Sequence, residues 1–216
     1  MSAKKSRFFL IFAILPFLTS CSNVVCDVSD VQATVVFDYH DEESLPDSRT
    51  CIFVKIDGDV SRTESIKIVN TENKYEWRVE NPTLLQSKAG DWAGSANVRG
   101  EGENALPQGN YRLHYKNMAG EEAEMDFSVI YPAQFSEQQA TDFPKALTDD
   151  SLTFSEKIAV YDKNGDLLFF GNIEKNTDSI LKKFPDADFI RVCYEDNSKK
   201  YMCFMPPEYL EKKAEN

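Results

Sequence analysis

Residues 106–115 contain the pattern that decides the fold: Leu106-Pro107-Gln108-Gly109-Asn110-Tyr111-Arg112-Leu113-His114-Tyr115. Residues typical of turns, Pro, Gly and Asn, come first, and apolar or aromatic side chains then follow at alternate positions. Alternation with a period of two places one set of side chains on a buried sheet face and the other set in solvent. The stretch therefore predicts a half-buried strand from Tyr111 to Lys116.

The same alternation recurs on both sides of this stretch, between clusters of turn residues such as Asp57-Gly58-Asp59. It predicts seven strands: Gln32–Tyr39, Cys51–Ile56, Ser65–Val69, Lys74–Val79, Ser95–Val98, Tyr111–Lys116 and Ala123–Tyr131. Short strands of this number in about 100 residues are typical of an antiparallel β-sandwich. We therefore predict a mainly β fold with such a sandwich over residues 31–132.

The stretch that leads into Tyr111 resembles the tyrosine corner of immunoglobulin-like and fibronectin-III-like modules. The turn at Ala119-Gly120 and the strand that carries Met125, Phe127 and Val129 resemble the closing hairpin of bacterial Ig-like repeats. The resemblance implies an Ig-like antiparallel β-sandwich in which the tyrosine hydroxyl hydrogen-bonds back to the preceding loop. The strand at Tyr111 has no cysteine, so the disulfide between the two sheets of antibody domains cannot be present.

Residues 133–153 are predicted to be a linker with one short helix. A capping-box pattern at Ser136-Glu137-Gln138-Gln139 predicts the helix start, and Phe143-Pro144 predicts its end. Apolar side chains in this segment need burial, which predicts that the linker wraps over the fold: Phe135, Phe143, Leu147 and Leu152.

Residues 154–207 predict a small α+β unit with the order ββαββ. Asn164-Gly165 is a strong hairpin signal between the strands Lys157–Tyr161 and Leu167–Ile173. Asn176 can cap a short helix that Pro185 stops, and a second hairpin joins Phe189–Tyr194 to Tyr201–Met205. A unit of this size would be only marginally stable on its own. We therefore expect it to pack against the sandwich or to be held by a disulfide. The charged tail 208–216 is expected to fray or to form a short helix.

The amino terminus has the order of segments found in an export signal. Basic residues at Lys4, Lys5 and Arg7 precede an apolar run from Phe8 to Leu18. The run is shorter than the roughly 20 apolar residues that a membrane-spanning helix needs.

The end of this run resembles the lipobox of bacterial lipoproteins, Leu18-Thr19-Ser20-Cys21. The resemblance implies that signal peptidase II removes residues 1–20, that the Cys21 thiol carries lipid, and that residues 21–30 form a tether. Two or three acyl chains anchor a protein far more firmly than one. The expected location is the cell membrane or outer membrane, on the exported side. The alternative is ordinary signal-peptidase cleavage with Cys21 as a plain thiol; no Ala-x-Ala site supports it.

The chain is acidic. Residues 1–20 contain three basic side chains and no acidic one, so the processed chain would have 21 basic and 36 acidic side chains, a formal net charge of −15. A strongly acidic surface repels phosphate backbones, which argues against nucleic acid as a partner. It also argues against electrostatic binding to anionic lipid, so the lipid on Cys21 would have to anchor the protein.

Four cysteines remain beside Cys21. Export would permit disulfides, and four cysteines allow up to two bridges in three possible connectivities. We predict a bridge between Cys193 and Cys203 on the two arms of the last hairpin, and Cys26 with Cys51 is a candidate for a second. Their wide spacing and the absence of nearby histidines make a zinc site a poor alternative, and no metal or cofactor is predicted.

No catalytic constellation is predicted. His40 lies among acidic residues, where a solvated loop is a simpler explanation than a metal site, and His114 is expected to face solvent from its strand. No Gly-x-Ser-x-Gly elbow is present for a serine hydrolase. Paired carboxylates of a glycoside hydrolase meet only in space, so the sequence does not test for them.

The loop predicted at Asp91-Trp92-Ala93-Gly94 is the one candidate contact site. Trp92 could be a platform on which a sugar or a peptide stacks, or it could fill the core between the sheets.

These observations predict a membrane-anchored cell-envelope lipoprotein that binds or scaffolds another envelope or extracellular component, a protein or a glycan, without catalysis. The alternatives are a lipid-anchored hydrolase of glycan or peptide and a purely structural spacer. Two facing carboxylates in a deep cleft would favour the hydrolase, whereas exposed aromatic side chains would favour binding.

Overall fold

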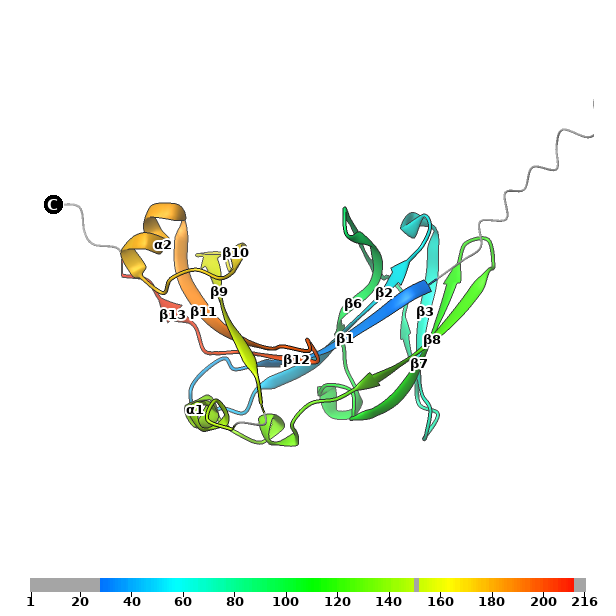
Figure 1. The fold of residues 1–216 in the computed structure, drawn as a ribbon, viewed down its shortest axis with the longest axis horizontal. Helices are drawn as coiled ribbons and strands as arrows, with labels where there is room; N and C mark the ends of the chain where they lie inside the picture. Colours follow the sequence, from blue (N-terminus) through cyan, green and yellow to red (C-terminus); the bar gives the residue numbers. More distant parts are fainter. Residues whose placement is uncertain (1–27, 150–151, 212–216) are drawn as a thin grey trace, which may run out of the picture.

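The computed structural model describes residues 28–149 and 152–211, and the fold over these residues is mainly β. They form thirteen strands in two sheets, with only short helices between them (Figure 1). Within this part of the chain, no helix has the length and apolar character needed to cross a membrane.

The larger sheet has nine strands and contains both ends of the described chain. Its order is β10-β9-β11-β12-β1-β2-β6-β5, and β13 pairs with β11. The strands are β1 (Val28–Asp38), β2 (Asp47–Ile56), β5 (Thr83–Ser87), β6 (Gly90–Val98), β9 (Phe154–Asp162), β10 (Leu167–Gly171), β11 (Ala187–Asp196), β12 (Tyr201–Phe204) and β13 (Glu208–Tyr209). All pairs are antiparallel except β1 with β12.

The smaller sheet is antiparallel and has the order β4-β3-β7-β8. Its strands are β3 (Thr63–Asn70), β4 (Glu76–Val79), β7 (Gly109–Asn117) and β8 (Glu122–Val129). Side chains of β3 and β7, including Ile66, Ile68 and Leu113, share one core with Ile52 and Val54 of β2. Each strand thus buries one face, as its period-two sequence predicts.

The larger sheet curls into a half-barrel with one face left open (Figure 1). The smaller sheet covers the outer side of one end. Helix α2 (Thr177–Lys183) covers the outer side of the other end, where Ile180 packs against Ile158, Val160 and Val192. The core therefore lies on the outside of the curl.

Tyr111 makes the contact expected of a tyrosine corner. Its hydroxyl donates a hydrogen bond of 2.6 Å to the carbonyl oxygen of Pro107, in the loop before β7. The ring is fully buried and stacks on Phe127 of β8, with ring centroids 5.5 Å apart. This bond fixes the loop against the strand that follows it.

Each strand predicted over 31–132 overlaps an observed strand, but the sequence missed β5. Trp92 and its neighbours lie within β6, not in a loop, and β5 pairs with β6 through Leu85 and Trp92. All five residues of β5 are exposed, so the buried alternation that marks the other strands is absent.

The helix predicted to begin at Ser136 and end at Phe143-Pro144 is wrong. Two 3₁₀ turns occupy Ala133–Ser136 and Ala140–Asp142, and α1 (Phe143–Ala146) begins where the helix was expected to end. Proline fits the first turn of a helix because the N–H that it lacks has no partner there. The linker does wrap over the core: Phe135 and Phe143 are buried, and Leu152 packs against them, whereas Leu147 is exposed.

The predicted elements of 154–207 are present, with a hairpin at Asn164-Gly165 and a helix capped by Asn176, whose side chain accepts from the Ser179 N–H at 3.0 Å. They join the first half of the fold by strand pairing within the nine-stranded sheet. In the parallel pair of β12 with β1, Tyr201 lies opposite Val35, and Cys203 lies opposite Phe37. Tail residues Glu208–Tyr209 form β13 instead of the fraying or helix that we expected.

The predicted disulfide between Cys193 and Cys203 is not formed: both cysteines are free and buried. The register explains this. Cys193 lies opposite Phe204, and Cys203 lies opposite Tyr194, so the two cysteines are offset by one residue. An offset of one places their side chains on opposite faces of the sheet. Cys51 is also a free thiol, and its predicted partner Cys26 lies outside the described residues.

Candidate functional site

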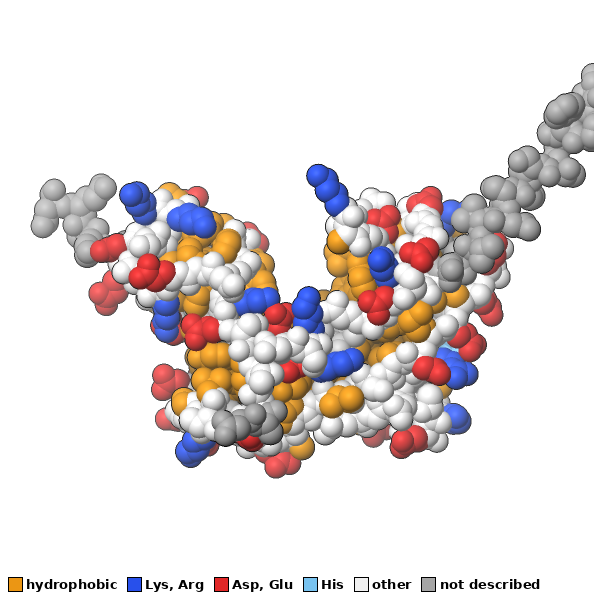
Figure 2. All heavy atoms as spheres, in the orientation of Figure 1, with side chains coloured by type: hydrophobic (Ala, Val, Ile, Leu, Met, Phe, Trp, Pro, Cys, Tyr) orange, Lys and Arg blue, Asp and Glu red, His pale blue; other side chains and the backbone are white. Residues whose placement is uncertain are grey.

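One face of the nine-stranded sheet is open and lies opposite the face that packs into the core. We call it the inner face. Along β1, Ala33, Val35 and Phe37 point into the core, so the alternate residues Thr34 and Val36 point to the inner face. Figure 2 shows this face as a wide valley with hydrophobic side chains on both walls and Lys and Arg side chains between them. The valley spans strands from both ends of the described chain.

An ion-pair cluster lies at the floor of the inner face, where the two ends of the chain meet. Asp38 of β1 accepts a hydrogen bond of 3.2 Å from Arg49 of β2. Its other carboxylate oxygen lies 2.6 Å from Nη2 of Arg191 on β11. The two groups form an ion pair, but their relative orientation does not meet the geometry of a hydrogen bond. The Asp38 and Arg191 side chains are only 13% and 12% exposed. The cluster therefore joins three strands in a place with little water.

Arg191 also fixes the ends of two strands. Its guanidinium donates hydrogen bonds to the carbonyl oxygens of Tyr39 and Met205, both at 2.8 Å, and to that of Phe204 at 3.2 Å. Tyr39 follows β1, Phe204 ends β12 and Met205 comes next, so one side chain holds the seam between β1 and β12.

Aromatic rings and cations alternate on the wall made by β9 to β12. Arg191 lies 5.5 Å from the ring centroid of Phe204, Phe204 lies 6.1 Å from Phe170, and Lys157 lies 5.5 Å from Phe170. Lys157 also forms an ion pair with Glu195. Lys157 and Arg191 are therefore both paired, and Phe170 remains 38% exposed.

A row of aromatic rings crosses the rim of the same wall. Tyr161 stacks on Phe189 with centroids 4.9 Å apart, and Phe189 lies 5.7 Å from Tyr209. Tyr209 is 71% exposed, and Leu167, opposite Tyr161 on β10, is 56% exposed. Burial raises the pKa of the Tyr161 hydroxyl, so this group stays neutral at physiological pH. The rim is an exposed apolar surface.

The opposite wall contains a hollow of about 230 Å³ beside Trp92. It is lined by Gln32, Thr34, Cys51, Phe53, Leu85 and Trp92. Trp92 is therefore neither on a loop nor a plug between the two sheets; it stands on β6 with its side chain on the inner face. Of the two alternatives drawn from the sequence, the core plug is therefore not observed, and the stacking platform stays a prediction.

The free thiols are poor nucleophiles. Burial raises the pKa of the Cys193 thiol to about 12, and burial raises the pKa of Cys203 and Cys51 as well. A thiolate is the reactive form of cysteine, so these groups are inert near neutral pH.

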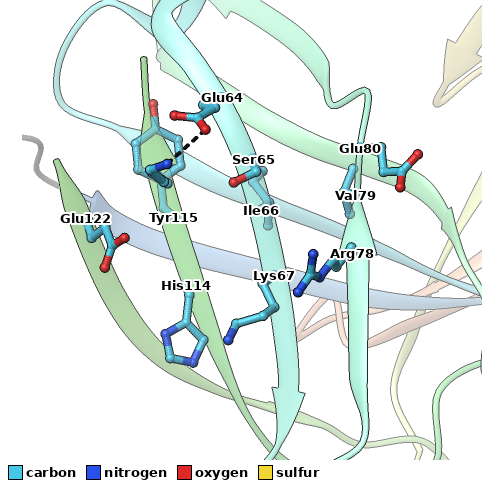
Figure 3. Close-up of a pocket in the computed structure, with 11 residues that line it drawn as sticks. Glu64, Ser65, Ile66, Lys67, Arg78, Val79, Glu80, His114, Tyr115 and Glu122 are labelled. Atoms are coloured by element: carbon cyan, nitrogen blue, oxygen red, sulfur yellow. Dashed lines mark hydrogen bonds and ion pairs between the residues drawn. The ribbon is translucent and has the colours of Figure 1, made fainter. Parts of the chain in front are cut away.

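A second depression, of about 470 Å³, lies on the outer face of the smaller sheet (Figure 3). Its charges are largely paired across strands: Lys116 with Glu64 at 2.9 Å, and Lys67 with Glu76 at 3.5 Å. His114 faces this side, as predicted, and lies 2.8 Å from Glu124. Exposed pairs of both signs are typical of a solvated sheet face.

His40 and the acidic residues beside it form a solvated turn. Asp41 accepts hydrogen bonds from the backbone N–H groups of Glu43 and Ser44, at 2.9 and 2.7 Å. His40 is exposed, with Nδ1 3.8 Å from Asp38. Across residues 28–149 and 152–211, no group of three or more His, Cys, Asp or Glu side chains is arranged to hold a metal ion.

Sequence reasoning found Trp92 but missed the other inner-face residues, chiefly Arg191, Phe170 and Tyr209. The alternation in each strand could place Arg191 and Lys157 on one face. It could not show that this face continues across β12 into β1. Cys21 lies outside the described residues. The chain matches no protein-family model, no curated protein and no solved structure.

Proposed function

We propose that this protein is a lipid-anchored, non-catalytic binding protein of the bacterial cell envelope, and that the inner face is its recognition surface. The lipid on Cys21 would hold the protein on the cell membrane or outer membrane. The inner face would bind or scaffold another envelope or extracellular component, either a protein or a glycan.

One observation carries the proposal: a concave sheet face with exposed aromatic and apolar side chains extends over both halves of the fold. Tyr209, Leu167, Phe170 and Leu85 are all more than a third exposed on this face or its rims. Exposed apolar patches of this kind mark interaction sites on soluble domains. Aromatic residues and arginine are also the residues enriched where proteins bind partners.

The carboxylates of the inner-face floor support binding over hydrolysis. Asp38 is held by Arg49 and Arg191, and Glu195 is held by Lys157. A general acid or base needs a carboxyl group that can exchange its proton with a substrate. Both carboxylates are instead held in ion pairs that join neighbouring strands.

We further propose that residues 28–131 are an Ig-like module. Its sheets, β1-β2-β6-β5 and β3-β7-β8 with β4 added at the edge, have the strand orders ABED and CFG of that fold. The hydrogen bond from Tyr111 to Pro107 supports this proposal.

Protease shaving of intact cells, combined with chemical crosslinking, tests the function. We expect the wild-type protein to be crosslinked to a partner and to partition into detergent. We expect Cys21→Ala to abolish palmitate labelling and detergent partitioning. Unchanged labelling and partitioning in Cys21→Ala would contradict the anchor, and the absence of any crosslinked partner would favour a structural spacer.

A further inference from the structure

The hollow beside Trp92 lies on the inner face, where β6 pairs with β2. Gly94 lies opposite Phe53 in the pairing of β6 with β2, and it is two residues from Trp92 on the same face. A Cβ at Gly94 would lie 2.0 Å from the Ile52 carbonyl oxygen, so only glycine allows β6 to approach β2 this closely. Trp92 and Phe53, one from each of these strands, both line the hollow.

Two polar groups of the hollow already have backbone partners: Thr34 donates to the Lys199 carbonyl oxygen at 2.8 Å, and the Cys51 thiol donates to that of Ala96 at 3.3 Å. Among the described residues, neither the Gln32 amide nor the Trp92 indole N–H makes a side-chain hydrogen bond, and Lys55 makes no ion pair. Lys55 lies opposite Trp92 and opposite Asp30, which also makes no ion pair in this part of the chain. On the other wall, by contrast, Lys157 and Arg191 are both paired.

The chemistry of this set favours an uncharged ring that carries hydroxyl groups. The residues that line the hollow have no formal charge, and the nearby Lys55 and Asp30 balance each other. The negative π faces of Trp92 and Phe53 attract the C–H face of a sugar ring. The Gln32 amide and the indole N–H offer donors and an acceptor for hydroxyl groups at its edge. An anionic ligand would be repelled by the chain, whose formal net charge is −12.

We propose that this hollow binds one neutral sugar unit of a glycan, stacked on Trp92 and hydrogen-bonded by Gln32. This inference rests on the proposed function and names the ligand class for one part of the inner face. The hollow is small and open, so it would hold one unit of a longer chain that continues along the valley.

Fluorescence titration of the mature protein tests the sugar site. Trp92 becomes the only tryptophan after Trp77→Phe, because the chain has two. The probes are neutral oligosaccharides of glucose, mannose, galactose and N-acetylglucosamine, with an oligogalacturonate and an acidic peptide as comparators, in a detergent without a sugar headgroup. We expect at least one neutral oligosaccharide to shift the Trp92 emission and to saturate. Binding only by the acidic probes, or no shift with any probe, would overturn the proposal.

Variants locate the site. Calorimetric titration with the same oligosaccharides measures binding to each variant. Trp92→Ala and Gln32→Ala should each weaken binding by about tenfold or more, which corresponds to ~1.4 kcal/mol. Trp92→Phe should restore much of the affinity because it keeps an aromatic face. Tyr75→Ala, which removes an exposed ring next to β4 of the smaller sheet and outside the inner face, is the matched control and should leave binding unchanged. Equal affinity in Trp92→Ala and wild type would overturn the site.

The two proposals fail separately. If crosslinking from the inner face captures a protein partner while no oligosaccharide binds, the proposed function stands and the sugar site is wrong. If oligosaccharides bind and Tyr75→Ala weakens their binding as much as Trp92→Ala does, the hollow is not the binding site and the inference is wrong.

Discussion

The Arg191 guanidinium lies 2.6 Å from the Asp38 carboxylate and so links β11, near the end of the chain, to β1 at its beginning. Both side chains are almost buried, and Arg191 also caps carbonyl groups that follow β1 and end β12. The seam between the two halves of the large sheet therefore depends on contacts far apart in sequence.

We expect Arg191→Ala to lower the free energy of unfolding by about 3 kcal/mol, because Asp38 loses its closest cationic partner and the Tyr39 and Met205 carbonyl groups lose the hydrogen bonds from Arg191. The matched control is Arg112→Ala, which removes an exposed pair with Asp126 and should have a much smaller effect because solvent screens that pair. Urea denaturation measures both values. Equal losses in the two variants would contradict the role given to the seam.

A chain cut after residue 153 should not fold cooperatively. It would lose β12, which covers the edge of β1, and it would lose Tyr194 and Tyr201, which pack against Phe143 and Phe135. Near-ultraviolet circular dichroism during urea denaturation measures this. A cooperative transition like that of the whole chain would show that the first half folds independently.

The sequence predicted local structure well because local structure follows side-chain alternation. The strand at Tyr111, its turn and the contact to Pro107 all follow from neighbouring residues. Strand β5 was missed since Leu84 and Leu85 sit side by side on an exposed edge and do not alternate with polar residues.

Long-range pairing was beyond the sequence. The sequence of Tyr201–Phe204 does not indicate that this strand pairs with β1 in parallel. The inner face, which depends on this pairing, could therefore not be predicted from the sequence. The error about Cys193 and Cys203 has a related cause. Their spacing fits a hairpin, but a shift of one residue in register moves one of them to the other face.

The native thiols Cys51, Cys193 and Cys203 should react slowly with alkylating reagents at pH 8 and rapidly in urea. Their raised pKa values keep them protonated, and two of them are fully buried. Mass spectrometry of the labelled peptides measures this. A peptide that links Cys193 to Cys203 before reduction would contradict the register.

The ion pair of Asp47 with Arg99 should make stability depend on pH. Arg99 donates two hydrogen bonds, of 2.7 and 2.8 Å, and they lower the pKa of the Asp47 carboxyl. Because the pKa of Asp47 is lower in the folded chain than in the unfolded chain, where it is about 3.9, the pair stabilises the fold at pH values above that of the unfolded chain. This stabilisation is lost as the pH falls through the pKa of the folded state.

Asp47→Asn should therefore cost up to about 1 kcal/mol at pH 7, because the pair is partly exposed, and less as the pH falls below about 4. Thermal unfolding of the variant and wild type from pH 7 to pH 3 measures the difference. A difference that stays constant over this range would show that the charge of Asp47 is not its source.

The most direct test of the inner face as a recognition surface is photocrosslinking in intact cells. A photoreactive residue would be placed at Phe170 or Leu85, one on each wall, and at Met118, which is 68% exposed in a turn of the smaller sheet. We predict that the two inner-face positions capture the same partner and that Met118 does not. Capture from Met118 with none from Phe170 and Leu85 would contradict the account.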